Sequence, residues 1–275
     1  MAGISEGSVV NYTNCCFDAI ESLHDIFVQP LTEEEKELEK KWMENHLGFG
    51  GLWWKGYLMY NGTIVVLYTW PGLNGSGYYT RKANYGLNVQ IGNAPSNLRI
   101  VDYSTGHTGS AHDSAAFKYT TSYRYPELLF RGEEFAWADS AYRVSPRMIP
   151  VHKRPASNQD YNAYFDCHVS SLHVHSEHFS INSKAEHLEA CCWIHICIIL
   201  HNLCIDVDGG QSHFAIAQSY MESGLGDGVG GTGDEEDESY IADQAGEVKR
   251  QQLVKELATI KNKNFVFPSN YLPDL

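Results

Sequence analysis

The feature that most constrains the fold is a run of strand-like patterns in the middle of the chain. Residues 57–60 and 63–67 are largely apolar and flank Asn61-Gly62, and Asn-Gly between apolar runs favours a tight hairpin turn. In residues 85–91 apolar side chains alternate with polar or small ones, and a turn leads from there into an apolar run at 98–103. The pattern therefore predicts two antiparallel hairpins.

Helical patterns lie on both sides of these strands. Apolar side chains at spacings of three and four predict a helix over residues 4–29. Thr32 and Glu35 form a capping box, which predicts a helix running to about Asn45. Further on, the sequence predicts a helix at 114–123 with Asp113 as its N-cap and a strand at 135–138. It then predicts a loop-rich stretch at 144–161 and helical structure from 162 to 205 with a break between 178 and 184. Helices, then strands, then mixed elements indicate an α+β or mixed α/β fold.

Charge is distributed unevenly along the 275 residues. The net charge of −14 argues against a nucleic-acid partner, but residues 207–275 carry −7 and residues 45–184 carry +3. The glycine-dense and then acidic stretch at 224–238 predicts a disordered linker. We therefore expect an N-terminal helical region at 1–48, a central domain at 49–206, and an acidic, largely disordered tail at 207–275.

Several features predict a protein of the nucleus or the cytoplasm. The N-terminus lacks the basic start and apolar run of a secretory signal, and the seven cysteines include no CxxC pair, so reduced thiols are expected. The most apolar stretch, 190–205, is short for a membrane span and contains His195, His201 and Asn202. A buried helix, with no membrane partner, is the better interpretation.

A zinc site is a possible rival for the cluster of histidines late in the chain. Its ligands would be Cys167, His173, His175 and His178, but no known finger spacing fits them. His173 and His175, two residues apart, cannot share one face of a helix. Histidines that are hydrogen-bonded or exposed are therefore favoured over a zinc site.

Six short motifs occur in a fixed order along most of the chain. They are Asn61-Gly62-Thr63, Arg81 to Gln90, Gly109-Ser110-Ala111-His112-Asp113, Trp137 to Tyr142, Ser176-Glu177-His178 and Leu200-His201-Asn202. Each alone is weak, but together they resemble the DDE superfamily nuclease of PIF/Harbinger-type transposases, in particular fungal versions, over about 4–206. The resemblance implies an RNase H-like fold, with a mixed sheet whose first three strands are antiparallel and which helices flank.

The resemblance also implies a chemistry and a site. In the family, three carboxylates hold two divalent metals, Mg²⁺ or Mn²⁺, for hydrolysis of phosphodiester bonds in double-stranded DNA. By position, Asn61 takes the place of the first aspartate, Asp113 is the second, and Glu177 is the glutamate. Asp139 is expected as a supporting acid near the sheet edge.

The chain departs from the family pattern at two places in this site. Asn61 keeps the shape of aspartate but loses its charge and one oxygen, so weak metal binding and greatly lowered activity are expected. After Glu177 a basic segment typical of the family is missing, lost either in evolution or by faulty splicing of the gene model. Two usually basic positions are His173 and His175, which weakens the expected phosphate contacts.

Three interpretations follow from these departures. The first is a transposase-derived nuclease impaired by Asn61. The second is a catalytically inactive derivative that binds DNA or a protein, and the third is a gene model that yields no stable protein. Because the family often works with a separate Myb-like DNA-binding protein, such a partner is expected, together with a nuclear location.

Overall fold

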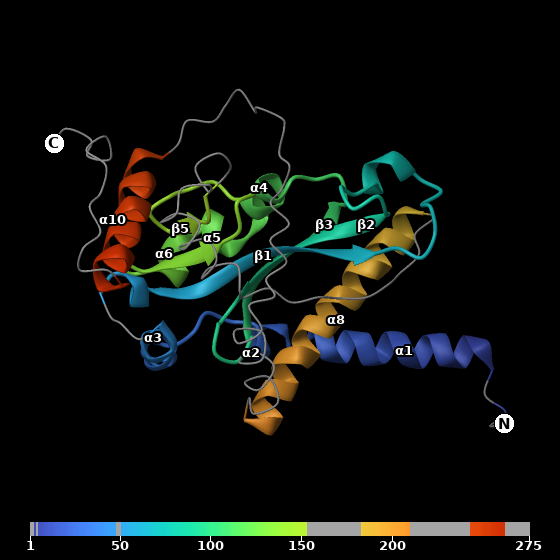
Figure 1. The fold of residues 1–275 in the computed structure, drawn as a ribbon. Coiled ribbons are helices and arrows are strands. Elements are labelled where there is room, and N and C mark those ends of the chain that lie inside the picture. The colour runs from blue at the N-terminus through green and yellow to red at the C-terminus, as the bar shows by residue number, and fades with distance from the viewer. Residues whose placement is uncertain (1–2, 4, 48–50, 153–182, 210–242, 262–275) are drawn as a thin grey trace.

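A five-stranded mixed sheet forms the centre of the molecule (Figure 1). The computed structural model describes residues 3, 5–47, 51–152, 183–209 and 243–261. The strands are β1 (Gly56–Val66), β2 (Gly86–Asn93), β3 (Ile100–Thr108), β4 (Phe135–Ala138) and β5 (Met148–Pro150), in the order β3-β2-β1-β4-β5. The first three strands pair antiparallel, whereas β4 pairs parallel with β1 and β5 with β4. The predicted α+β, RNase H-like mixed sheet is confirmed.

The predicted hairpin turn at Asn61-Gly62 is wrong. Both residues lie inside β1, where Asn61 pairs with Ile91 and Gly62 with Gln90 of β2. β1 is the central strand with a partner on each side, so its pairing overrides the local turn signal. The second predicted hairpin is confirmed, because β2 and β3 pair antiparallel.

Helices cover the sheet and extend from it. They are α1 (Glu6–Glu21), α2 (His24–Phe27), α3 (Glu33–Leu47), α4 (Asp113–Ala116), α5 (Thr121–Arg124), α6 (Pro126–Leu129), α8 (Lys184–Asp208) and α10 (Gln244–Lys261), with 3-10 turns η1 (Trp53–Lys55), η2 (Gly75–Tyr78) and η3 (Phe117–Tyr119). The capping box before α3 is confirmed, because the Thr32 backbone N–H donates to Glu35 Oε2 (2.7 Å) and the Glu35 N–H to Thr32 Oγ1 (3.3 Å).

Three other sequence predictions need correction. The helix expected over 4–29 is divided into α1 and α2. The helix expected at 114–123 is divided too, because the Thr120 hydroxyl accepts the Tyr123 N–H and caps a new turn, α5. Asp113 is the first residue of α4, and His112 is its N-cap, accepting the Ser114 N–H. The stretch expected to be loop-rich, 144–161, contains the three-residue strand β5, and residues 153–161 lie outside the described residues.

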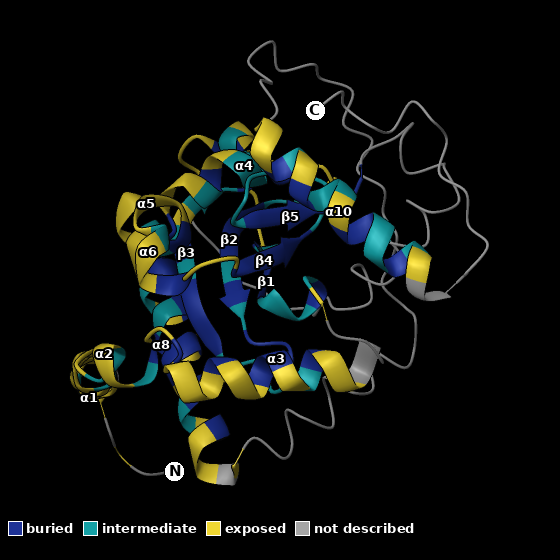
Figure 2. Ribbon diagram, turned by 90° about the vertical axis from the view of Figure 1, so that its left-hand side faces the viewer, coloured by how far each residue is buried: buried dark blue, intermediate teal, exposed yellow. Residues whose placement is uncertain are grey.

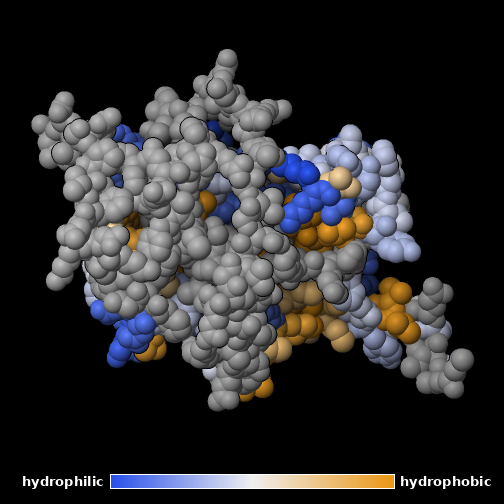
Figure 3. All heavy atoms as spheres, viewed as in Figure 1, coloured by the Kyte–Doolittle hydropathy of each residue, from blue (hydrophilic) through white to orange (hydrophobic). Residues whose placement is uncertain are grey.

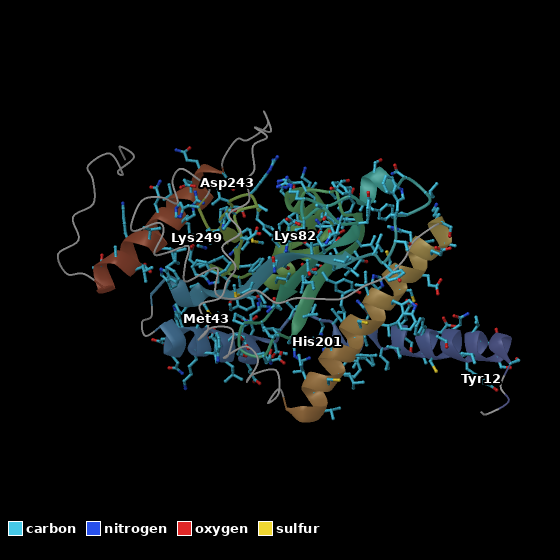
Figure 4. All side chains as sticks on the ribbon, turned by 45° about the vertical axis from the view of Figure 1, so that its right-hand side comes forward. Tyr12, Met43, Lys82, His201, Asp243 and Lys249 are labelled. Carbon is cyan, nitrogen blue, oxygen red and sulfur yellow. The ribbon has the colours of Figure 1, made fainter. Side chains whose placement is uncertain are left out.

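Helix α8 packs as a core helix, as the sequence predicted. By length and composition Lys184–Val207 could cross a membrane, but Ala190, Ile194, Ile198 and Ile199 are buried in a cluster with β1, β2 and β3. Its buried Asn202 donates to the carbonyls of Phe27 (2.8 Å) and Ile100 (2.7 Å) and accepts the Ile100 N–H (2.9 Å). On the same helix, His201 Nε2 lies 2.9 Å from the Leu98 carbonyl (His201 is labelled in Figure 4).

The two ends of the described chain pack differently. α1 meets α8 through an edge-on contact of Phe17 with Trp193 (4.4 Å between centroids). The outer part of α1 leaves the body and carries exposed Val9 and Val10, and Figure 3 shows apolar surface there. α10 falls within the range assigned to the acidic tail. It packs against the sheet through buried side chains such as Leu253, whose carbonyl accepts the Trp53 indole N–H (2.8 Å).

Candidate active site

The carboxylate of Asp113 rests directly on the backbone of the central strand. Asp113 begins α4, and a Cβ placed on Gly62 would lie 2.2 Å from Asp113 Oδ1 and 2.9 Å from Gln90 Nε2. Since real Cβ atoms do not approach other atoms so closely, no residue larger than glycine fits there without displacing the carboxylate. The glycine after Asn61 therefore provides space for Asp113 and forms no turn.

Two buried amides of β2 hold this carboxylate. Asn88 Nδ2 donates to Asp113 Oδ1 (2.8 Å) and to the Ala111 carbonyl (3.0 Å). Gln90 Nε2 donates to the same Oδ1 (2.9 Å) and to Asn88 Oδ1 (2.7 Å). Within the described residues, the hydrogen bonds to Asp113 all go to Oδ1, so Oδ2 remains available for a ligand.

Tyr142 fixes the orientation of this amide pair. Its hydroxyl donates to Gln90 Oε1, which leaves Gln90 Nε2 as the donor toward Asp113. Burial raises the pKa of Tyr142 well above its ordinary value, and the negative charges of Asp113 and Asp139 raise it further. The hydroxyl therefore stays protonated and is a permanent donor close to both acids.

The strand register places Asn61 beside Asp139 at the end of β4. The parallel pairing of β1 with β4 sets Tyr60 opposite Ala138, so the next residues along the two strands, Asn61 and Asp139, come side by side. Asp139 Oδ1 accepts the Ala141 N–H (2.8 Å), which turns the chain directly after β4. β4 is an interior strand between β1 and β5, so Asp139 lies at the end of a central strand.

The side chain of Asn61 does not face Asp113. Successive residues of a strand point to opposite sides of the sheet, and Gly62 is the residue that faces Asp113. Asn61 therefore points to the other side, and its amide forms no hydrogen bond with another described residue. The structure thus brings Asn61, Asp113 and Asp139 to one part of the sheet, while Glu177 lies outside the described residues.

The oxygen donors at this place suit a hard divalent cation. Asp113 and Asp139 supply carboxylates, a ligand type that Mg²⁺ and Mn²⁺ accept, whereas the Asn61 amide points to the other face of the sheet from Asp113. Across the described ranges, no three residues among His, Cys, Asp and Glu form a group that could hold a metal. Two carboxylates balance the charge of one divalent cation, so a pair of cations would require further acids, and Glu177 is the candidate that the family resemblance names.

The rival zinc ligands receive no support from the described residues. Cys167, His173, His175 and His178 lie outside the described ranges. On α8, His187 lies four residues before Cys191, and its Nδ1 is 2.9 Å from the Tyr78 hydroxyl. Burial raises the pKa of the Cys191 thiol, which disfavours the thiolate that binds zinc.

Sequence reasoning missed three members of this site: Asn88, Gln90 and Tyr142. Asn88 and Gln90 alternate with Leu87, Val89 and Ile91, a pattern typical of a strand with one solvated face. The structure buries both amides instead. Two amide side chains on one face, close in the chain to an Asp at a helix start, are the signal that could have identified them.

Comparison with known proteins gives one result for the chain. A family model described as a DDE superfamily endonuclease matches residues 61–202, slightly more than half of the chain. Neither a curated protein nor a solved structure matches it. The matched range begins at Asn61, ends at Asn202 and includes Asp113, Asp139 and the amides of β2. It therefore covers the described residues of the candidate active site. The chain belongs to the DDE superfamily endonuclease family.

Proposed function

We propose that this protein derives from a transposase and that its nuclease domain hydrolyses phosphodiester bonds in double-stranded DNA with a divalent metal. The observation that carries the proposal is the carboxylate of Asp113, held on the central strand by two buried amides with one oxygen left available. Asp113, Asp139 and Glu177 would hold Mg²⁺ or Mn²⁺, with Asn61 at the position of the first acid. When bound, the metal would activate water and stabilise the leaving oxygen.

Asn61 is the reason to expect weak activity. An amide has no net charge, so it cannot neutralise a shared dication as a bridging carboxylate does. Its side chain also points away from the face on which Asp113 lies. These two points favour the second candidate function, a catalytically inactive derivative that binds DNA or a protein through the retained fold.

The finer assignments are also proposals. The six ordered motifs support membership of the PIF/Harbinger type, with fungal relatives. A Myb-like DNA-binding protein as partner and a nuclear location fit a transposase origin, because DNA recognition in that type often comes from a second protein.

Nicking of supercoiled plasmid in the presence of Mn²⁺ tests the function. The wild type would be compared with Asn61→Asp, Glu177→Ala, and Asn61→Asp combined with Asp113→Ala. We expect weak or absent nicking by the wild type and more nicking by Asn61→Asp, because the substitution restores a negative charge beside Asp139 at the end of β4. The Asp113→Ala change should abolish that gain, since it removes an acid of the site.

The outcomes separate the two candidate functions. Nicking by the wild type that Glu177→Ala abolishes would show a working nuclease and refute the proposed impairment at Asn61. If Asn61→Asp folds, as circular dichroism would show, but does not nick, the inactive binding derivative is favoured.

A further inference from the structure

The segment that follows Asp113 has an unusual composition for this chain. Residues 114–126 contain two cations, Lys118 and Arg124, and no Asp or Glu, in a protein whose net charge is −14. The same segment contains three tyrosines, Tyr119, Tyr123 and Tyr125. Local positive charge in an acidic protein marks a place where an anionic partner is tolerated.

All three tyrosines and both cations are exposed. Tyr119, Tyr123 and Tyr125 each keep more than half of their surface accessible, and Lys118 and Arg124 are also exposed. The segment spans η3 and α5, and Figure 2 shows exposed residues along α5 and α6 beside α4. We call these five residues the tyrosine–arginine patch.

The guanidinium of Arg124 is held in place for binding. It lies over the ring of Tyr119 (5.0 Å to the centroid), and its Nε donates to the Lys118 carbonyl (3.3 Å). Neither Lys118 nor Arg124 forms an ion pair with an acid in the described part of the chain. The two terminal nitrogens of Arg124 are thus available as a preoriented fork of the type that recognises phosphate.

The patch is firmly joined to the candidate active site. Phe117 packs against Tyr142 (5.4 Å between centroids), the residue that orients Gln90 toward Asp113. At the start of α5, buried Asp102 accepts the backbone N–H groups of Thr121 (3.0 Å) and Ser122 (2.8 Å). Rigid support on both sides fixes the position of the patch relative to Asp113.

We propose that the tyrosine–arginine patch binds the sugar–phosphate backbone of DNA, next to the phosphodiester bond that lies at Asp113. This inference rests on the proposed function, because it assumes DNA at that site. Guanidinium, ammonium and tyrosine hydroxyl groups are common donors to phosphate oxygens, and such interactions set the register of DNA without reading its sequence. Because the net charge of −14 repels DNA, affinity for DNA must come from local positive patches of this kind.

The test is equilibrium DNA binding without metal. A fluorescein-labelled duplex would be titrated by anisotropy in EDTA, at several salt concentrations, with wild type and Lys118→Glu/Arg124→Glu. We expect the variant to bind about tenfold or more weakly. We also expect the slope of log K against log salt to fall by about 2, close to one unit for each phosphate that the variant no longer neutralises.

A matched control corrects for net charge. Lys41→Glu/Lys255→Glu changes two cations on α3 and α10 and reaches the same net charge, since replacing two cations with Glu lowers −14 by 4 to −18 in each variant. We expect this control to bind nearly as the wild type does. Equal weakening in the two variants, no weakening in the patch variant, or failure of the wild type to bind at low salt would each overturn the proposal.

Two further variants protect the test against misfolding and separate it from catalysis. If circular dichroism shows that the charge reversal unfolds the protein, Lys118→Gln/Arg124→Gln replaces it, with the same expected drop in slope. Replacing the three tyrosines with phenylalanine removes only hydroxyls, and we expect a severalfold loss of affinity. Binding is measured in EDTA and so does not depend on catalysis. If the wild type never nicks DNA but the patch variant binds DNA more weakly than the wild type, the proposed nuclease activity is refuted and the proposed role of the patch is supported.

Discussion

Replacing Gly62 with alanine is the sharpest test of how Asp113 is held. The added Cβ would lie 2.2 Å from Asp113 Oδ1, whereas ordinary contact begins at 3.4 Å. The carboxylate would therefore have to move by about 1.2 Å, the difference between these two distances. Its hydrogen bonds to Asn88 (2.8 Å) and Gln90 (2.9 Å) cannot both survive that shift.

The energetic cost follows from those two hydrogen bonds. A hydrogen bond to a charged group contributes about 1.5–3 kcal/mol, and alanine regains some stability by restricting the unfolded chain. We expect Gly62→Ala to lower the free energy of unfolding by about 1–3 kcal/mol. Misplacing a catalytic group by an ångström costs about 100-fold in rate, and this loss would appear as slower nicking in the Asn61→Asp background.

Urea unfolding followed by tryptophan fluorescence measures the stability, and plasmid nicking with Mn²⁺ measures the rate. Gly7→Ala is the matched control, because a Cβ on Gly7 in α1 meets no atom within 4 Å. It should leave stability unchanged or raise it, since alanine favours helix over glycine. A Gly62→Ala variant as stable as this control would refute the contact between Asp113 and β1.

Two further predictions concern stability. Asn202→Leu should lower the free energy of unfolding by about 2 kcal/mol or more, because the buried backbone groups of Ile100 and the partly buried carbonyl of Phe27 lose their partner. Urea unfolding that shows a loss no larger than that of exposed Asn14→Ala would contradict this. Burial lowers the pKa of His107 and His195 in the folded protein. As the pH drops below about 6.5, these histidines therefore bind protons more readily in the unfolded chain than in the folded one, and the free energy of unfolding should fall. Equal urea midpoints at about pH 7.5 and about pH 5.5 would exclude this dependence.

Local chemistry explains which parts of the fold could be predicted from the sequence. The capping box of Thr32 and Glu35 depends only on residues three apart, and it forms as expected. The prediction of a turn at Asn61-Gly62 was wrong, because a glycine needed for a turn and a glycine needed for the close approach of another side chain look the same in a sequence. The short strand β5 has only three residues, too few to show a periodic pattern.

The candidate site could be predicted only in part. Asp113 and Asp139 stand in recognisable motifs, and the negative charges of both raise the pKa of buried Tyr142. The amides that hold Asp113 were missed, because Asn88 and Gln90 occupy alternating positions that usually face water. Only the packing of α4 over β2 buries them, and that packing is a property of the tertiary structure.

The extended course of β1 also governs how the protein ages. An Asn-Gly pair loses ammonia when the glycine nitrogen attacks the asparagine side chain, and the reaction leaves aspartate or isoaspartate behind. Here Asn61 and Gly62 are paired with Ile91 and Gln90 within a strand, which holds the backbone away from the bent geometry that this cyclisation needs. Protein that has been unfolded by heat and then refolded would therefore gain carboxylates at position 61 that protein kept folded lacks, so nicking by such a preparation reports chemical damage and not the activity encoded by the sequence.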